Sequence, residues 1–410
     1  MYNMRLYSIF WTVLCLLFPG ILLAQWGNRY ADPVFESILT TSGIPFSSAV
    51  KEGQTSPTTL YLDFYEPSED TLSARPLVIT VFGGAYVTGS RDWSDMVEYC
   101  TRFAEHGYVA ASIDYRLLPI TSLNSSTIIR SAYMAAQDVN SAIRFLKAHC
   151  NEYRIDTSNI FLLGNSAGSI AILNEIFMSN EERPSQTFVS PDLGPMNSCG
   201  YDEYAGFSSK VAGAVSQWGG VLDVEVIDLD EYVPLCLIHG TEDNAVPYDS
   251  GFCYSNLSLS IFPYMYGSHA IANHLSDLGI EDYEFHPFEG EEHCFYITAF
   301  TNLIEDKFDA CFHIARDFLY NHLDTHLTTG VSHYETDNVK IYPNPASDVL
   351  FVEVKGGERV ANITLCDMQG RIVKECDASP VFLDRLPSGV YAVHVKTSDG
   401  RKFIQKVVVK

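Results

Sequence analysis

Between residues 60 and 323, apolar runs rich in β-branched residues alternate with stretches of helical periodicity. Strands that are apolar along their whole length and separated by helices form mostly parallel sheets with both faces covered. The sequence therefore predicts a doubly wound, mostly parallel α/β fold for this part of the chain. The expected strands are Leu60–Tyr65, Leu77–Phe82, Tyr108–Tyr115, Asn159–Leu163, Val211–Gln217, Val233–His239 and Tyr283–Phe288. The expected helices are Ile128–Cys150, Ala167–Met178, Ser268–Leu278 and Asp306–Leu323.

Charge is distributed unevenly along the 410 residues and places a domain boundary near residue 336. Of the formal net charge of −25, residues 1–24 contribute +1 and residues 337–410 contribute +2, which leaves −28 on residues 25–336. This acidic balance argues against a nucleic-acid partner, because phosphate neutralisation needs clustered Lys and Arg.

The first 24 residues are typical of an export signal peptide. Arg5 precedes an apolar run, Leu6–Leu23, and Ala24 offers a small residue for cleavage before Gln25. A transmembrane anchor is the alternative, because 18 residues just reach spanning length. The Pro19-Gly20 pair near the end of the run favours the signal peptide. Since no other stretch is long and apolar enough, we expect no transmembrane segment in the mature protein.

Export permits disulfides, but the middle section carries an odd number of cysteines. Its seven cysteines imply that at least one thiol is unpaired or pairs elsewhere. Their spacing matches no zinc site, so we expect no metal.

A candidate nucleophile follows the strand that ends at Leu163. The segment Gly164-Asn165-Ser166-Ala167-Gly168 has the pattern G-x-S-x-G and lies between a strand and a helix. Small residues on both sides of Ser166 allow a sharp turn that exposes its hydroxyl. The pentapeptide alone is a weak signal, but this setting favours a nucleophile over a plain turn.

A candidate acid and a candidate base follow two later strands. Asp243 comes after Val233–His239, where a carboxylate can orient an imidazole, and Glu242 beside it is the main competitor. His293 comes after the last strand, where a general base is needed. The chain order Ser, Asp, His is the order of α/β-hydrolases and is more specific than any one position.

A glycine-rich turn follows the strand Leu77–Phe82 and offers backbone donors for an oxyanion. Such a loop lets N–H groups approach a developing negative charge closely. We assign the donors to the N–H groups of Gly84, Ala85 and Ala167.

With these residues in place, the middle section resembles an α/β-hydrolase serine carboxylesterase of the broad hormone-sensitive-lipase and carboxylesterase type. The resemblance covers about residues 57–323 and implies Ser166 as nucleophile, Asp243 as acid and His293 as base. Two positions depart from the family's His-Gly-Gly-Gly loop, where Phe82 replaces the His and Ala85 the third Gly. The matching segments are FGGAYVTGS from Phe82, DYRLLP from Asp114, Ile155-Asp156, Ser166-Ala167-Gly168 and His239-Gly240.

The substrate pocket is expected to be bordered by Tyr86, Trp218 and an irregular insertion at residues 180–210. The family's substrates range from short acyl esters to acylated sugars and lipids. We expect a small-molecule ester substrate, cleaved through an acyl-enzyme without any cofactor. The alternatives are a serine peptidase on the same fold and a catalytically silent surface-binding protein.

Residues 337–410 show short alternating strands with hairpin turns and no helical period. This pattern predicts a small all-β sandwich. The expected strands are Asp348–Val354, Ile363–Cys366, Val390–Val395 and Phe403–Val409, and the expected turns are Asp367–Gly370 and Asp399-Gly400.

This last region resembles the C-terminal sorting domain of type IX (Por) secretion. The matching segments are Tyr342–Ala346, Gly370–Val373, Leu386–Tyr391 and Lys406–Lys410. The resemblance implies secretion machinery as a partner, passage through the periplasm and outer membrane, and a final place outside the cell or on its surface. A carbohydrate-binding β-module has the same strand pattern and stays open. The predicted organisation is thus signal peptide 1–24, catalytic domain 25–336 and sorting domain 337–410.

Overall fold

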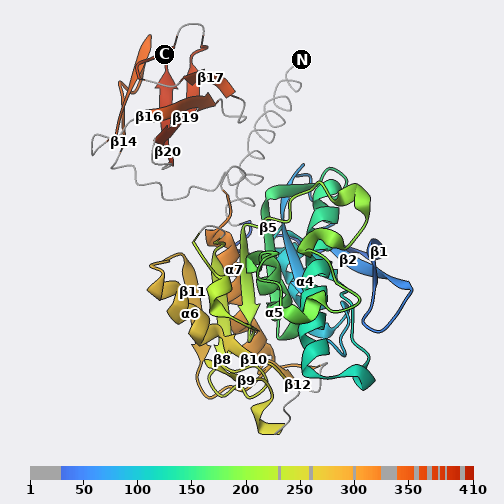
Figure 1. Ribbon diagram of the computed structural model, residues 1–410. Coiled ribbons are helices and arrows are strands. Elements are labelled where there is room, and N and C mark those ends of the chain that lie inside the picture. The colour runs from blue at the N-terminus through green and yellow to red at the C-terminus, as the bar shows by residue number, and fades with distance from the viewer. Residues whose placement is uncertain are drawn as a thin grey trace, which may run out of the picture. The chain divides into compact units, whose positions relative to one another are not determined.

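The computed structural model divides the chain into two compact units, up to Thr325 and from His326 (Figure 1). The predicted signal peptide lies outside the described residues. So does the predicted boundary at residue 336, and the predicted domain limits stay predictions. Among the described residues, no helix is both long and apolar enough to cross a membrane. The described residues are 29–229, 232–257, 262–298, 302–324, 339–354, 360–366, 372–376, 379–383, 386–397 and 402–410.

An eight-stranded sheet in the order β1-β2-β4-β3-β5-β6-β8-β11 forms the centre of the first unit. The neighbours from β4 to β11 are all parallel, whereas β2 pairs antiparallel with β1 and β4. The mostly parallel sheet predicted from the sequence is therefore confirmed. Its strands are β1 Ile38–Val50, β2 Pro57–Pro67, β3 Arg75–Val81, β4 Val109–Ile113, β5 Ile155–Asn165, β6 Gly213–Gln217, β8 Leu235–Gly240 and β11 Tyr283–Phe288.

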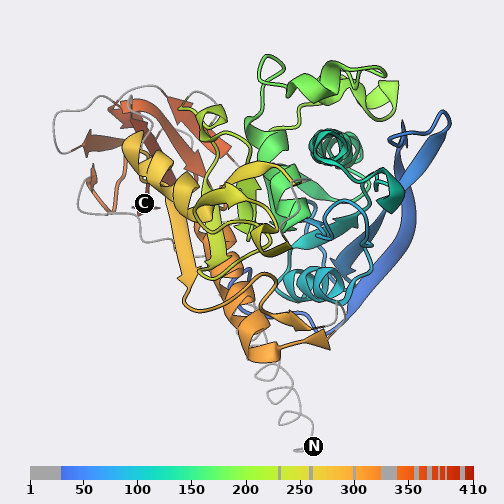
Figure 2. The ribbon, with the colours of Figure 1, turned by 60° about the horizontal axis from the view of Figure 1, so that its bottom comes forward.

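Helices cover both faces of this sheet. The helices α4 (Ser125–Ala148) and α5 (Ala167–Phe177) pack together on one face, and α3 (Ser94–Glu105) and α7 (Glu305–Asn321) lie on the other (Figure 2). Helix α6 (Ser268–Asp277) packs on β8 and β11. This arrangement confirms the doubly wound fold class.

The first unit also contains short strands and 3₁₀ turns outside the central sheet. The small strands are β7 Gly220–Val221, β9 Ser250–Phe252, β10 Tyr264–Gly267, β12 Ile297–Thr298 and β13 Asn302–Leu303. The 3₁₀ turns are Ile120–Ser122, Ser185–Phe188, Met196–Ser198, Asp202–Tyr204, Val224–Val226 and Ser255–Leu257.

Apart from the short elements, β1 and α3 of the first unit were not predicted. The strand β1 is largely exposed, pairs only with β2 and contains Gly43 and Pro45, which weaken its strand pattern. The helix α3 is amphipathic, because Met96, Tyr99 and Phe103 are buried one turn apart. Its helical spacing was available in the sequence and was overlooked.

The second unit is a β-sandwich, as predicted. A three-stranded and a four-stranded antiparallel sheet share one apolar core, to which Leu350 and Val352 contribute from one sheet and Ile363, Val393 and Val407 from the other. The two predicted hairpin turns lie outside the described residues. The strands are β14 Val339–Tyr342, β15 Val349–Val354 and β18 Val381–Phe382 in one sheet, and β17 Ile372–Cys376, β16 Val360–Cys366, β19 Gly389–Thr397 and β20 Lys402–Val409 in the other.

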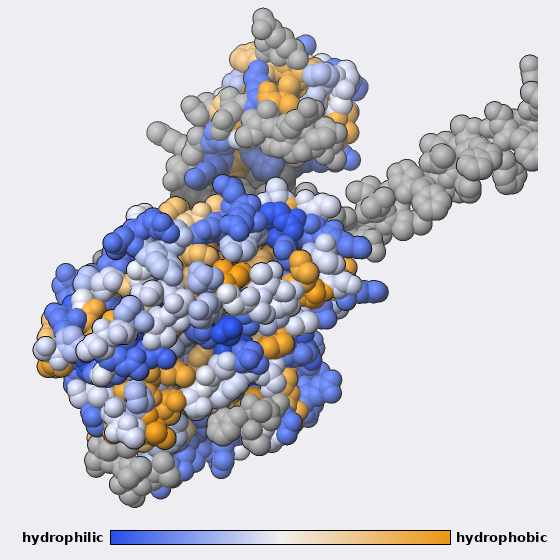
Figure 3. Space-filling view, turned by 90° about the vertical axis from the view of Figure 1, so that its right-hand side faces the viewer, coloured by the Kyte–Doolittle hydropathy of each residue, from blue (hydrophilic) through white to orange (hydrophobic). Residues whose placement is uncertain are grey.

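The seven cysteines of the middle section are all described, and none of them forms a disulfide. Five are buried, including Cys236 in the centre of β8. The surface in Figure 3 is largely hydrophilic, with hydrophobic side chains in scattered patches. Since the described cysteines of the first unit form no disulfide, packing of its hydrophobic core stabilises it, and most of its thiols are buried.

Candidate active site

The turn between β5 and α5 holds Ser166 in a strained backbone conformation. Its φ of 50° and ψ of −120° are rarely adopted by a residue with a side chain. The Ser166 N–H donates to the Gln217 carbonyl oxygen at 2.9 Å, which anchors the turn to the end of β6. A Cβ atom on Gly168 would clash with the Val81 carbonyl oxygen, so only glycine lets α5 lie this close to β3. The turn has the form of a nucleophile elbow.

Ser166, His293 and Asp243 form one hydrogen-bond chain although 127 residues separate the first two. The Ser166 Oγ lies 2.8 Å from His293 Nε2, and His293 Nδ1 lies 2.7 Å from Asp243 Oδ2. With the proton on Nδ1, the ring donates to Asp243 and its Nε2 accepts from the Ser166 hydroxyl. The competitor Glu242 has an exposed side chain, and the contact that the structure gives to His293 comes from Asp243.

Both oxygen atoms of the Asp243 carboxylate have two hydrogen-bond partners each. Its Oδ1 accepts from the backbone N–H groups of Ala245 and Val246 at 2.8 and 3.0 Å. Its Oδ2 also lies 3.1 Å from Nε2 of the buried His239, whose Nδ1 lies 2.9 Å from Ser268 Oγ. Sequence reasoning missed this second imidazole, which fixes the carboxylate in place.

These contacts shift the acidity of both groups. Burial raises the pKa of Asp243, but the hydrogen bonds with His239 and His293 outweigh it and hold that pKa well below its usual range. Burial lowers the pKa of His293, whereas the adjacent Cys294 and the Asp243 carboxylate raise it, and the net shift is upward. Only the neutral ring can accept a proton, so the competent fraction of His293 grows as the pH rises through this raised pKa.

The glycine-rich loop after β3 presents its backbone to Ser166. Among the described turn and loop hydrogen bonds, none is donated by the N–H groups of Gly84, Ala85 or Ala167, so these donors are available to an oxyanion. Gly84 has a φ of +112°, and a Cβ atom there would clash with the Thr88 carbonyl oxygen. Ala85 has a φ of 51°.

Aromatic packing supports this loop at the position where the family has its His. The Phe82 ring stacks on Tyr115 at 4.3 Å between centroids and contacts Trp93 at 6.2 Å. The Tyr115 hydroxyl donates to the Gly83 carbonyl oxygen at 3.1 Å. The departure at Phe82 is therefore accommodated by stacking and by a hydrogen bond to the next residue.

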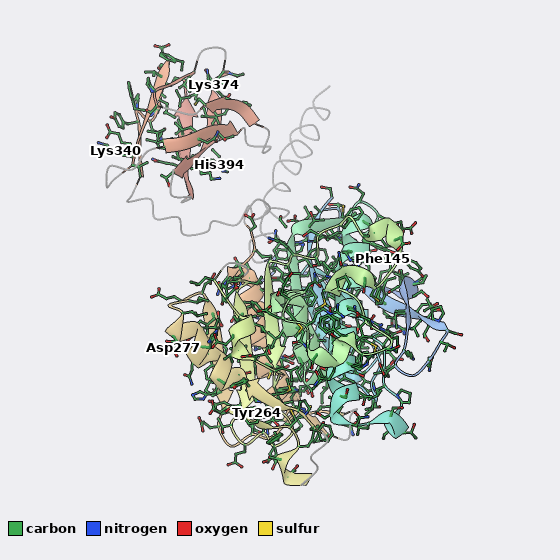
Figure 4. All side chains as sticks on the ribbon, in the orientation of Figure 1. Phe145, Tyr264, Asp277, Lys340, Lys374 and His394 are labelled. Atoms are coloured by element: carbon green, nitrogen blue, oxygen red, sulfur yellow. The ribbon has the colours of Figure 1, made fainter. Side chains whose placement is uncertain are left out.

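A cavity with almost wholly apolar walls opens beside Ser166. Ala85 and Ala167 line it together with Ser166. The predicted Tyr86 also lines it. Its other walls come from α4 (Ile128, Ile129, Ala132) and from the β9–β10 region (Cys253, Phe262, Pro263, Met265). Tyr264, labelled in Figure 4, marks this region on β10.

Trp218 and the insertion at residues 180–210 were expected to border the substrate pocket, but neither lines this cavity. Trp218 is fully buried and is not among the lining residues, because its ring packs edge-on against Tyr296 at 4.8 Å and His293 at 6.3 Å. The insertion at residues 180–210 contributes no lining residue either. Side chains of α4 hold it elsewhere, with Arg130 Nη1 donating to the Gln186 carbonyl oxygen at 2.7 Å and Gln137 Nε2 to that of Leu193 at 2.8 Å.

One group of potential metal ligands occurs among the described residues. Cys236, Glu284 and His286, on the paired strands β8 and β11, have ligand atoms within 4.8 Å of one another. Glu284 already accepts from His286 at 2.9 Å. The group shares no residue with the Ser166 hydrogen-bond chain.

Comparison with known families identifies both parts of the chain. Residues 62–231 match the family BD-FAE, and residues 340–410 match the secretion system C-terminal sorting domain. Both resemblances expected from the sequence are thereby confirmed. The central part of the chain is thus similar to α/β-hydrolases of the esterase type, and its C-terminal part is similar to Por secretion sorting domains.

Individual relatives are named as carboxylic ester hydrolases. The probable isoprenylcysteine alpha-carbonyl methylesterase ICMEL1 of Arabidopsis thaliana is 27% identical over 214 residues, 46% of this chain and 42% of that protein. The probable carboxylic ester hydrolase LipM of Mycobacterium tuberculosis is 29% identical over 109 residues, 26% of this chain and 23% of that protein. The chain thus spans less than half the length of these relatives. Among solved structures, Thermogutta terrifontis esterase 2 aligns with 68% of this chain and 95% of its own, with 20% identity and a TM-score of 0.47.

Proposed function

We propose that the protein is an exported serine esterase that cleaves carboxylic esters through an acyl-enzyme. The observation that carries the proposal is the continuous chain of hydrogen bonds Ser166–His293–Asp243 at the mouth of an apolar cavity. Relatives named as carboxylic ester hydrolases support the reaction class.

Each proton in this reaction is handled by the His293 ring. Nε2 takes the Ser166 proton while Oγ forms a bond to the ester carbonyl carbon, and the Asp243 carboxylate stabilises the resulting imidazolium. The oxyanion is held by the N–H groups of Gly84, Ala85 and Ala167. The imidazolium then protonates the leaving alcohol as the C–O bond breaks. A water molecule, deprotonated by the same ring, attacks the acyl-enzyme and restores Ser166.

The cavity suits the acyl part of the substrate, because no charged side chain is among its described lining residues. Hydrolysis of p-nitrophenyl esters from acetyl to palmitoyl by the purified protein tests the proposal. The absence of hydrolysis by the folded protein would refute it.

We expect Ala132→Phe to shift the acyl preference toward short chains. Ala132 is a small cavity-lining residue on α4, and a phenyl ring there would occupy the space of several methylene groups. The kcat/KM for octanoyl esters should fall about tenfold or more relative to acetyl esters. Ser126→Phe, an exposed position on the same helix, is the matched control and should leave the ratio unchanged. An unchanged ratio in Ala132→Phe would place the acyl group elsewhere.

We further propose that residues 1–24 direct the chain to the periplasm and that residues 337–410 direct it across the outer membrane. The match to a secretion sorting domain supports the second step. A chain that ends at residue 336 should therefore accumulate as folded protein in the periplasm of a host with this secretion system. Immunoblots of periplasmic and extracellular fractions measure this, and normal release of the shortened chain would contradict it.

A further inference from the structure

A buried polar network adjoins the nucleophile turn and has no part in the mechanism above. Its centre is Asp95, in the first turn of α3, which is 1% exposed. Asn165, the residue before Ser166, donates from Nδ2 to Asp95 Oδ2 at 2.6 Å and to Tyr296 Oη at 3.3 Å. A side-chain amide has two hydrogens and can serve both acceptors.

The network continues from Tyr296 to the other elements of the site. Tyr296 lies three residues after His293, is fully buried, and donates from Oη to Gln217 Oε1 at 2.9 Å. Gln217 Nε2 donates to Tyr99 Oη at 2.6 Å, and the Gln217 main-chain oxygen accepts the Ser166 N–H. One set of hydrogen bonds thus joins α3, the ends of β5 and β6, and the turn that carries His293.

No cation balances the charge at the centre of this network. Among the ion pairs of the described residues, none includes Asp95. The side chains that hydrogen-bond to it are neutral: Asn165 of β5 and Tyr296 of the His293 turn. Gln217 of β6 and Tyr99 of α3 follow further along the network and are neutral too. Phe308 of α7 packs against Tyr99. Burial raises the pKa of Asp95 to about 6. A buried carboxylate without a cation costs stability, which points to a role other than stabilisation.

We propose that Asp95 is a positioning residue whose carboxylate holds Asn165 and, through it, Tyr296, and so fixes the nucleophile turn against the turn of His293. The proposal rests on the serine esterase function proposed above. The contact between Ser166 Oγ and His293 Nε2 depends on both turns, and a displacement of about 1 Å between reacting groups costs on the order of 10²-fold in rate.

The test compares Asp95→Asn with the wild-type full chain. We expect kcat for p-nitrophenyl esters to fall about tenfold or more and KM to stay within about twofold, because no side chain of the network lines the cavity beside Ser166. The thermal midpoint at pH 8 should be unchanged or higher. The folded-state pKa lies above the unfolded value of 3.8, so the charged form destabilises the fold above pH 6 and the amide removes that cost. Below pH 6 the difference in thermal midpoint should shrink, because the carboxyl of the wild type is then protonated.

Two further variants complete the test. Tyr296→Phe removes the hydroxyl that joins Asn165 to Gln217 and should lower kcat in the same way. Glu98→Gln changes a partly exposed carboxylate on α3 that pairs with Arg102, and it should leave kcat unchanged.

The outcomes distinguish a failure of the positioning role of Asp95 from a failure of the esterase function. A wild-type kcat in Asp95→Asn or in Tyr296→Phe would refute the positioning role, and so would a lower kcat accompanied by an equal loss of thermal stability. Absence of Ser166-dependent hydrolysis in the wild type would refute the esterase function and this role with it. Should Asp95→Asn fail to fold, Tyr296→Phe alone decides the positioning role.

Discussion

Replacing Ser166 by Ala is expected to lower kcat for p-nitrophenyl ester hydrolysis by at least about 10⁴-fold. The substitution removes the proposed nucleophile, the Oγ that lies 2.8 Å from His293 Nε2. Because Ala carries the same Cβ, the turn between β5 and α5 should keep its shape. The fold should persist, since Ser166 makes its structural contact through its backbone N–H.

Covalent labelling with a fluorophosphonate ester provides an independent measure of the same step. Mass spectrometry should find one adduct on Ser166 in the wild type and none in Ser166→Ala. Hydrolysis that survives the substitution would show that another group or a bound water does the chemistry, and the proposed mechanism would be wrong.

Replacing Asp243 by Asn is expected to lower kcat on the order of 10⁴-fold, whereas Glu242→Gln should change it less than about twofold. The NH₂ group of an Asn at position 243 would face the N–H at His293 Nδ1, and two donors cannot hydrogen-bond to each other. The ring would then favour the tautomer with its proton on Nε2, which cannot accept from Ser166. Glu242 has the same charge and neighbouring position but an exposed side chain, so it is a matched control.

Circular dichroism and thermal unfolding should accompany both variants, because Asp243 also accepts two backbone N–H groups at the start of its loop. The opposite ranking, with Glu242→Gln the more damaging, would overturn the assignment of the acid. Equal and small effects would show that the carboxylate does not orient the base.

Much of this arrangement could be predicted because parallel strands carry their carboxyl ends to one edge of a sheet. Ser166 and Asp243 each follow a strand with a buried apolar run, and His293 follows β11, in which aromatic residues alternate with polar ones. Both patterns are recognisable from local sequence. Chain order then restricted which turns could meet.

The sequence could not show what depends on distant side chains. The cavity walls from α4 and from the β9–β10 region come from segments about a hundred residues apart. The role of His239 depends on where its ring points, towards Asp243 four residues later and Ser268 at the start of α6. Trp218 is expected at the pocket from the sequence, but its backbone has a φ of 38° and its ring packs on Tyr296. Asp95 was overlooked together with its helix.

The unpaired thiols of the first unit have a consequence for a protein that leaves the cytoplasm. Because the seven described cysteines of this unit form no disulfide with one another, the packing of the described residues does not depend on an oxidising compartment. Its fold should be equally secure in reducing and oxidising surroundings, and five of the seven sulfur atoms are shielded from exchange as soon as the core closes.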